Sequence, residues 1–416
     1  MSTRGGAPPL PFPDVLLGAL APDGGLYMAE TWPALDGLAR VAQAYSSVAL
    51  AVIRPFVGIC FDAAELDDSV KTALMGFDRP EIAPLVELEP GLHLLELFHG
   101  PTFAFKDIAL QLLARLMARE LERRNARATV LVATSGDTGS AAIGAFGAMS
   151  RVTVIVLHPK GRVSEVQRRQ MTTSSYANIH NVAIEGTFDD AQALVKTLFA
   201  DREFATSMSL IAVNSINFVR IVAQSVYYFT ATAKLGRPAR FVVPTGNFGD
   251  IFAGEAASRM GLPMDGLIAA TNANDILARA LNSGVYDVRE AQATLSPSMD
   301  IQVASNFERA LFEASGRDTG WLSAAMGSFG RDRTLAIPPV VLDALRARYR
   351  VEAVSDEETL ETIRDIHVRH GRLIDPHTAV GVAAARRLAP LNDVPTVVLA
   401  TADAAKFPET VARATG

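Results

Sequence analysis

The chain has 416 residues, of which 49% are hydrophobic and 20% are charged, and its formal net charge is -6. A chain of this length and composition can bury a large core, and we expect it to divide into two or three domains. The small negative charge and the lack of any run of lysines or arginines argue against a nucleic acid or a membrane surface as a partner.

Three further features of the sequence predict the cellular compartment of the protein. Cys60 is the single cysteine, which rules out an intramolecular disulfide and favours a reducing compartment. The first residues contain no basic region followed by an apolar run, and no apolar stretch is long enough to span a bilayer. We therefore expect a cytoplasmic protein that is not attached to a membrane.

The chain changes pattern along its length. Residues 1–95 show an irregular start, a helical pattern at 41–56 and strand-like alternation at 85–97. Short apolar strands are then predicted at 129–134, 152–157, 210–213, 241–245, 267–271 and 396–401, with helices at 163–171, 188–199, 218–233, 356–370 and 379–388. This alternation predicts an α/β fold of open, mostly parallel sheets with helices on both faces, interrupted after residue 290 by a helical insertion. Ligands of such folds bind at the carboxyl ends of the strands.

The sequence HGPTFAFKD at residues 99–107 draws attention to one lysine. A turn at Gly100 is followed by Phe103 and Phe105, and Lys106 begins an amphipathic helix behind these bulky side chains. Lost hydration lowers the pKa of such an amine and favours the neutral form that attacks a carbonyl, as a Schiff-base lysine must. A lysine that extends to solvent from a helix end fits the same stretch. Of the six lysines, only Lys106 and Lys406 have unusual surroundings.

Two loops have the composition of anion sites. The TSGDTG sequence at residues 134–139 joins a strand to a helix and offers hydroxyls and free N–H groups, although helix capping by Ser135 or Thr138 explains the same residues. The GNFGD sequence at residues 246–250 can close its backbone around a phosphate, but so short a turn is weak evidence by itself. Neither the GxGxxG nor the GxxxxGK[ST] nucleotide fingerprint occurs in the chain.

The NSINFVR sequence at residues 214–220 opens another helix. Its amides, its hydroxyl and Arg220 can form a fork for a phosphate, while a capped helix with a solvated arginine explains this stretch taken alone. We expect no metal site, because His367 and His370 share a helix face without a carboxylate or cysteine pattern that completes a ligand set.

A desolvated lysine, two phosphate-type loops and no nucleotide fingerprint together suggest pyridoxal phosphate and a phosphorylated substrate. The chain resembles the threonine synthase family, in the group found in many proteobacteria and fungi, nearly from end to end. The stretches that carry the resemblance are STRG (2–5), DGGLY (23–27), LFHGPT (97–102), FKD (105–107), TSGDTG (134–139), NSIN (214–217), PTGNFGD (244–250), SPSMDI (296–301), SNFER (305–309) and DPHT (375–378).

The resemblance implies a fold type II enzyme that uses pyridoxal 5'-phosphate. It implies an N-terminal domain at residues 1–95, a smaller α/β domain at 96–235 with the lysine and the substrate-phosphate loops, and a larger α/β domain at 236–416 with the cofactor-phosphate loop. The expected reaction converts O-phospho-L-homoserine and water into L-threonine and phosphate, by γ-elimination and then β-addition of water. The expected assembly is a monomer or a homodimer.

The resemblance also assigns roles to individual residues. Lys106 matches the lysine that holds the cofactor and then transfers protons, and Asp137 matches the residue that faces the cofactor's phenolic oxygen. Thr401 matches the residue that hydrogen-bonds the pyridine nitrogen. The loop expected to hold the cofactor phosphate consists of Gly246, Asn247, Phe248, Gly249 and Asp250. The residues expected to clamp the substrate phosphate are Thr134, Ser135, Thr138, Asn214, Ser215 and Arg220.

One motif departs from the family pattern. The family usually reads TAHPAKF near its C-terminus, whereas residues 401–407 read TADAAKF, so that Asp403 and Ala404 replace a histidine and a proline. A carboxylate beside the ring-nitrogen position can raise the proton affinity of that nitrogen and change the balance between water addition and simple elimination. Two alternatives to the synthase therefore stay open: a phospho-lyase that gives 2-oxobutyrate and ammonia, and a catalytically silent protein that binds an amino-acid phosphate.

Overall fold

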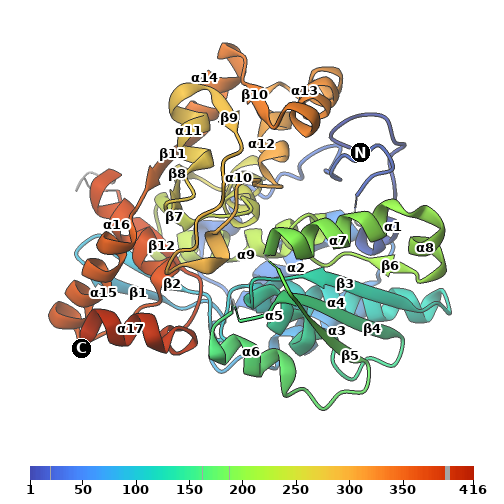
Figure 1. The fold of residues 1–416 in the computed structure, drawn as a ribbon, viewed down its shortest axis with the longest axis horizontal. Helices are drawn as coiled ribbons and strands as arrows, with labels where there is room; N and C mark the ends of the chain where they lie inside the picture. Colours follow the sequence, from blue (N-terminus) through green and yellow to red (C-terminus); the bar gives the residue numbers. More distant parts are fainter. Residues whose placement is uncertain (19, 162, 187, 389–393) are drawn as a thin grey trace.

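Two mostly parallel sheets organise the chain in the computed structural model, which describes residues 1–416 except 19, 162, 187 and 389–393 (Figure 1). The larger sheet orders its strands as β1 (Leu85–Glu89), β2 (Leu92–Glu96), β12 (Thr396–Ala400), β7 (Ala239–Pro244), β8 (Met264–Thr271) and β11 (Tyr349–Ala353). Only its β1–β2 pair is antiparallel. The smaller sheet is parallel throughout, in the order β5 (Ile179–Ile184), β4 (Val152–Pro159), β3 (Ala128–Ala133) and β6 (Leu210–Ile211). The prediction of mostly parallel sheets is confirmed.

Helices cover both faces of the larger sheet. Phe241 and Val243 of β7 belong to the core that includes α10 (Gly249–Arg259), whereas Val242 belongs to the core that includes α16 (Pro376–Leu388). The smaller sheet lies between α5 (Asp137–Phe146) and α7 (Phe188–Ala200) in the same way. Strands buried on both faces read as continuous apolar runs, which is why the sequence identified β3, β7 and β12.

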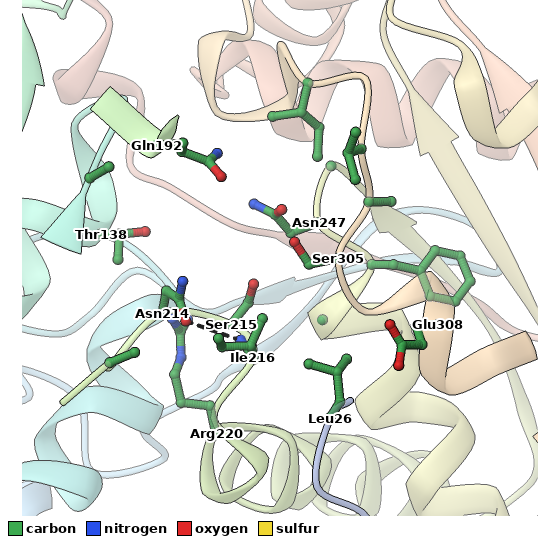
Figure 2. Close-up of a pocket in the computed structure, with 18 of the residues that line it drawn as sticks. Leu26, Thr138, Gln192, Asn214, Ser215, Ile216, Arg220, Asn247, Ser305 and Glu308 are labelled. Carbon is green, nitrogen blue, oxygen red and sulfur yellow. Dashed lines mark hydrogen bonds between the residues drawn. The ribbon is translucent and has the colours of Figure 1, made fainter. Parts of the chain in front are cut away.

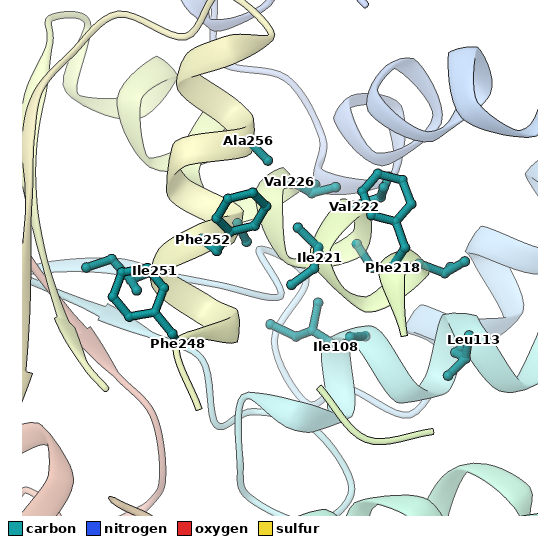
Figure 3. Close-up of a cluster of buried hydrophobic side chains, with 14 of the residues drawn as sticks. Ile108, Leu113, Phe218, Ile221, Val222, Val226, Phe248, Ile251, Phe252 and Ala256 are labelled. Carbon is teal, nitrogen blue, oxygen red and sulfur yellow. The ribbon is translucent and has the colours of Figure 1, made fainter. Parts of the chain in front are cut away.

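The central helix α9 (Phe218–Leu235) joins the two halves of the molecule. Figure 3 shows Ile221 of α9 between Ile108 of α4 (Lys106–Arg123) and Phe252 of α10. Nearly every residue of α9 is buried, including the polar Arg220, Gln224 and Ser225, so the helix lies inside the molecule. This packing fixes the start of α4, the start of α9 and the start of α10 relative to one another.

The remaining elements surround these layers. The elements without a prediction include the edge strands β5 and β11, whose partly exposed residues lack an apolar run, and the short C-terminal helix α17 (Pro408–Thr415). The helix expected at 41–56 begins later, at Tyr45. No helix among the described residues is long and apolar enough to cross a membrane. The other helices are α1 (Phe12–Leu17), α2 (Tyr45–Val57), α3 (Ala63–Leu74), α6 (Glu165–Thr172), α8 (Arg202–Ser207), α11 (Ile276–Ser283), α12 (Phe307–Ala314), α13 (Thr319–Asp332), α14 (Pro339–Arg348) and α15 (Asp356–His370). Three 3-10 turns are η1 (Leu38–Arg40), η2 (Pro297–Met299) and η3 (Ala404–Lys406). The strands β9 (Val285–Asp287) and β10 (Thr334–Ala336) pair with each other.

Candidate active site

A cavity of about 820 Å³ lies where strands of both sheets end. The segments that follow β3, β6, β7 and β12 all contribute to its wall, so it forms at the carboxyl ends of parallel strands. Every residue to which the sequence assigned a site role lines this one cavity: Lys106, Thr134, Ser135, Asp137, Thr138, Asn214, Ser215, Arg220, Gly246, Asn247, Phe248, Gly249, Asp250 and Thr401.

Lys106 is held by the turn that precedes it. The Asp107 carboxylate accepts hydrogen bonds from the backbone N–H and the hydroxyl of Thr102, each at 2.8 Å. The Phe105 N–H donates to the Thr401 carbonyl at 2.9 Å, which ties the turn to the end of β12. Lys106 is therefore the first residue of α4 and reaches into the cavity from a fixed backbone.

The environment of Lys106 favours its neutral form. Burial lowers the pKa of Lys106; Asp137 opposes this effect, and the positive charges of Lys406 and Arg220 add to it. The Lys106 Nζ lies 3.3 Å from Asp137 Oδ2 and 4.6 Å from the centre of the Phe105 ring. This arrangement agrees with a nucleophilic amine and not with a lysine that extends to solvent.

Asp137 is the centre of a hydrogen-bond cluster that the sequence did not predict. Besides Lys106, its carboxylate accepts from Gln167 Nε2 at 2.9 Å, from Ser298 Oγ at 3.1 Å and from Lys406 Nζ at 2.8 Å. Burial alone would raise the pKa of Asp137, but the nearby positive charges, first of all Lys406, hold it well below its usual range. The carboxylate is therefore ionised and bound from four elements of the fold.

Ser298 is itself positioned by a buried histidine. His377 Nδ1 lies 2.7 Å from Asp375 Oδ2, and the Ser298 N–H donates to His377 Nε2 at 3.1 Å. An accepting Nε2 means that Nδ1 carries the proton and donates it to Asp375. Ser298 and His377 lie in the SPSMDI and DPHT stretches, so the resemblance indicated the segments but not these roles.

The hydroxyls of the 134–139 loop differ in role: that of Thr134 stabilises the start of a helix, whereas those of Ser135 and Thr138 are left for the cavity. Thr134 Oγ1 accepts from the N–H groups of Gly136 and Gly139, each at 2.9 Å, and so caps the start of α5. The alternative that Ser135 or Thr138 caps this helix is wrong. Within the described part of the chain neither hydroxyl has a hydrogen-bond partner, and both line the cavity.

Arg220 is a buried cation without an ion-pair partner among the described residues. Its side chain is buried, Nη1 donates to the Val213 carbonyl at 3.3 Å, and Nε has no partner among the described residues. The solvated arginine considered above is therefore wrong, and Asn217, not Asn214, caps α9. In Figure 2 Arg220 extends from α9 toward Asn214 and Ser215, beside the open cavity. Burial lowers the pKa of Arg220 to about 10, so it stays charged at neutral pH and requires an anion.

The 246–250 loop approaches the opposite wall closely. A Cβ added to Gly246 would lie 3.0 Å from the Ser298 carbonyl oxygen, and one added to Gly249 would lie 3.2 Å from Ser215 Cβ. The loop opens α10, whose first N–H groups have no acceptor within the helix. A phosphate fits such a backbone cradle.

The side chains of two loop residues point elsewhere. Phe248 packs against Phe307 and Tyr349, with ring centres 5.4 and 5.1 Å away. Asp250 accepts from the hydroxyls of Tyr227 and Tyr228, and burial raises its pKa to about 7. Both residues therefore offer the cavity their backbone more than their side chains.

We expect Gly246→Ala to weaken cofactor binding at least about tenfold, because the methyl group meets rigid backbone at the 297–299 turn. Equilibrium dialysis of pyridoxal phosphate against the purified variant measures this affinity. Gly330→Ala is the matched control, because no atom of a described residue lies within 4 Å of a Cβ at that position. Unchanged affinity in Gly246→Ala would show that the cofactor phosphate binds elsewhere.

The N-terminus and the C-terminal motif also meet the cavity differently from expectation. Within residues 1–95 the sequence offered no chemistry beyond possible contributions from Ser2, Thr3 and Arg4; of these three, Arg4 lines the cavity, and it pairs with Glu308 at 2.8 Å. Asp403, in contrast, does not line it: Asp403 Oδ1 accepts from the Ala405 N–H at 2.8 Å and caps η3. The extra carboxylate of the TADAAKF sequence thus has a local structural partner.

The fold and the site define a class. Parallel sheets that place a desolvated lysine and a glycine-rich loop at the carboxyl ends of their strands fit a pyridoxal-phosphate enzyme of fold type II. A family model described as pyridoxal-phosphate dependent enzyme matches residues 80–402, and a model of the threonine synthase N terminus matches residues 1–74. The chain belongs to the threonine synthase family of pyridoxal-phosphate enzymes.

Relatives along the whole chain agree. Threonine synthase of Pseudomonas aeruginosa is 49% identical over 420 residues, which cover 100% of this chain and 90% of that protein. Threonine synthase of Saccharomyces cerevisiae is 40% identical and covers 99% of this chain and 88% of its own length. The crystal structure of pyridoxal-phosphate-bound threonine synthase from Brucella melitensis superposes with a TM-score of 0.96 at 50% identity, covering 100% of this chain and 91% of that one.

Proposed function

We propose that this enzyme converts O-phospho-L-homoserine and water into L-threonine and phosphate. The observation that carries the proposal is the pairing, in one cavity, of the Lys106 amine with the uncompensated Arg220 guanidinium. The first suits a carbonyl cofactor, and the second suits a substrate that bears a phosphate. The whole-chain likeness to threonine synthases supports the choice of substrate.

In the proposed complex the two phosphates occupy different walls. The backbone of Gly246, Asn247, Phe248, Gly249 and Asp250 holds the cofactor phosphate at the start of α10. Thr134, Ser135, Thr138, Asn214, Ser215 and Arg220 hold the substrate phosphate. Thr401 faces the pyridine nitrogen as a neutral hydroxyl, and Asp137 faces the phenolic oxygen.

When bound, pyridoxal phosphate supplies an electron sink for the electron pairs left as protons leave Cα and then Cβ. Lys106 holds the cofactor before the substrate arrives, and its freed Nζ then accepts and returns these protons. Arg220 keeps the phosphate leaving group in place while the Cγ–O bond breaks. A water molecule adds its hydroxyl at Cβ, a proton returns to Cγ, and the retained phosphate assists as a base.

The product distinguishes the proposal from its alternatives. The purified enzyme is supplied with pyridoxal phosphate and O-phospho-L-homoserine, and phosphate, threonine and 2-oxobutyrate are quantified. We expect threonine in equal amount to phosphate. Phosphate with 2-oxobutyrate and ammonia would instead identify a phospho-lyase, and no phosphate release would identify a silent binder. The local role of Asp403 as a cap supports the synthase, because its carboxylate does not line the cavity.

A further inference from the structure

A second buried lysine, Lys406, contacts the same Asp137 carboxylate as Lys106. Lys406 is fully buried and does not line the cavity, although it belongs to the η3 turn just beyond Thr401. Its Nζ lies 2.8 Å from Asp137 Oδ1 and donates to the Thr102 carbonyl at 2.8 Å. Asp137 Oδ2, on the other side of the same carboxylate, lies 3.3 Å from Lys106 Nζ.

We propose that Lys406 is a positioning residue. Its ammonium neutralises the Asp137 carboxylate at the oxygen that Lys106 does not contact, and Lys106 can therefore work as an uncharged amine. This inference rests on the function proposed above and adds a residue to its machinery. Lys406 acts through Asp137 and touches neither substrate nor cofactor.

A second positive charge near Asp137 is needed if Lys106 is to lose its proton. A single carboxylate at 3.3 Å from a buried amine would hold the proton on that amine by direct attraction. Lys406 is closer to the same carboxylate and is the largest of the charges that lower the pKa of Asp137. Besides the two lysines, the charged or titratable groups that interact with them or with Asp137 are Arg220 from α9, Asp250 from α10, His377 from α16 and Asp107 from α4; Asp137 itself comes from α5.

The backbone of Lys406 is as well fixed as its side chain. The Ser164 Oγ, at the start of α6, donates to the Lys406 carbonyl at 2.9 Å. Gln167 of the same helix donates to Asp137 Oδ1 at 2.9 Å. The smaller sheet's helix α6 and the C-terminal turn η3 thus meet at the Asp137 carboxylate. A lysine with purely structural duties would need only the carbonyl contacts and not the ion pair beside the reactive amine.

The test follows the proton on the Lys106 nitrogen in Lys406→Gln and Lys406→Arg. Glutamine keeps a donor for Thr102 and Asp137 without the charge, whereas arginine keeps the charge. In the holoenzyme, the pH at which the visible absorbance of the cofactor changes reports this proton. In the full-length chain freed of cofactor, competitive acetylation by acetic anhydride, read by peptide mass spectrometry, measures the pH at which Lys106 becomes reactive. Lys160, which is exposed, is the internal reference.

We expect both transitions to move to higher pH in Lys406→Gln, by about one pH unit or more, because a nearby positive charge is lost. Lys406→Arg should stay close to the wild type, and the reactivity of Lys160 should not change. Transitions that stay in place in folded Lys406→Gln would overturn the proposal.

A second variant keeps the test decisive if Lys406→Gln does not fold. Asp137→Asn is nearly isosteric, and it should move the Lys106 transition to lower pH, because Lys406 then faces Lys106 without the carboxylate. An unchanged or higher transition would overturn the proposal. Neither readout uses O-phospho-L-homoserine, so a wrong substrate assignment would leave these results intact and would appear only in the product analysis.

Discussion

Replacing Lys106 with alanine is expected to lower turnover of O-phospho-L-homoserine about 10⁴-fold or more. The variant loses the amine that holds the cofactor and the group that transfers protons, and proton transfer by a positioned side chain contributes ~10²–10⁴-fold by itself. Phosphate release measures the loss. The visible absorbance that the cofactor gains when attached to a lysine should also be missing.

The matched control for Lys106→Ala is Lys160→Ala, because Lys160 is exposed and, among the described residues, its side chain pairs only with exposed Glu185. Borohydride treatment of the wild type followed by peptide mass spectrometry should place the reduced cofactor on Lys106. A tag on Lys406 would contradict the assignment, and so would turnover retained in Lys106→Ala. The cavity favours Lys106, since Lys406 does not line it.

Arg220→Met should lower kcat/KM for O-phospho-L-homoserine by about 30- to 5,000-fold. Removal of one partner of a buried charge pair costs about 2–5 kcal/mol, and each 1.4 kcal/mol is tenfold. Arg220→Lys should recover only part of this loss, because an ammonium keeps the charge but cannot donate two hydrogen bonds in the bidentate geometry of a guanidinium. Steady-state kinetics of the three enzymes measure the effect.

Binding and stability measurements separate a ligand role of Arg220 from a structural one. Without ligand the wild type buries an uncompensated charge, so Arg220→Met should melt at the same temperature or higher. Inorganic phosphate should stabilise the wild type and not the variant. Pyridoxal phosphate should bind both alike; loss of cofactor affinity with an unchanged KM would mean that Arg220 holds the cofactor phosphate. Arg237→Met, at an exposed position just beyond α9, is the control.

Several parts of the site could be predicted because they are local in the chain. The turn before Lys106, the 134–139 loop and the 246–250 loop each lie between a strand and a helix, and each carries its chemistry within a few residues. Strands such as β7 and β12 were predicted because burial on both faces demands an unbroken apolar run. Edge strands β5 and β11 do not meet that demand, and their patterns are correspondingly weak.

The division into domains at 1–95, 96–235 and 236–416 remains a prediction. The strands β1 and β2 lie at the end of the first segment, yet β2 pairs with β12 near the C-terminus. The two family models also divide the chain earlier, between residues 74 and 80. We therefore propose that the first boundary lies before Leu85, because a strand belongs to the domain whose sheet it completes.

The sequence by itself determined the fold class and indicated Lys106 and the two phosphate-type loops as candidates, because periodicity and short motifs express contacts within one segment. Only the tertiary structure decided which charges face one another. Arg220 looked like a solvated arginine until the packing of α9 buried it without an anion. Lys406 lies 300 residues after Lys106 in the chain, and only the packing of η3 against α6 places both amines on the one carboxylate of Asp137. The pKa of a buried group depends on such distant neighbours, and no local pattern encodes them.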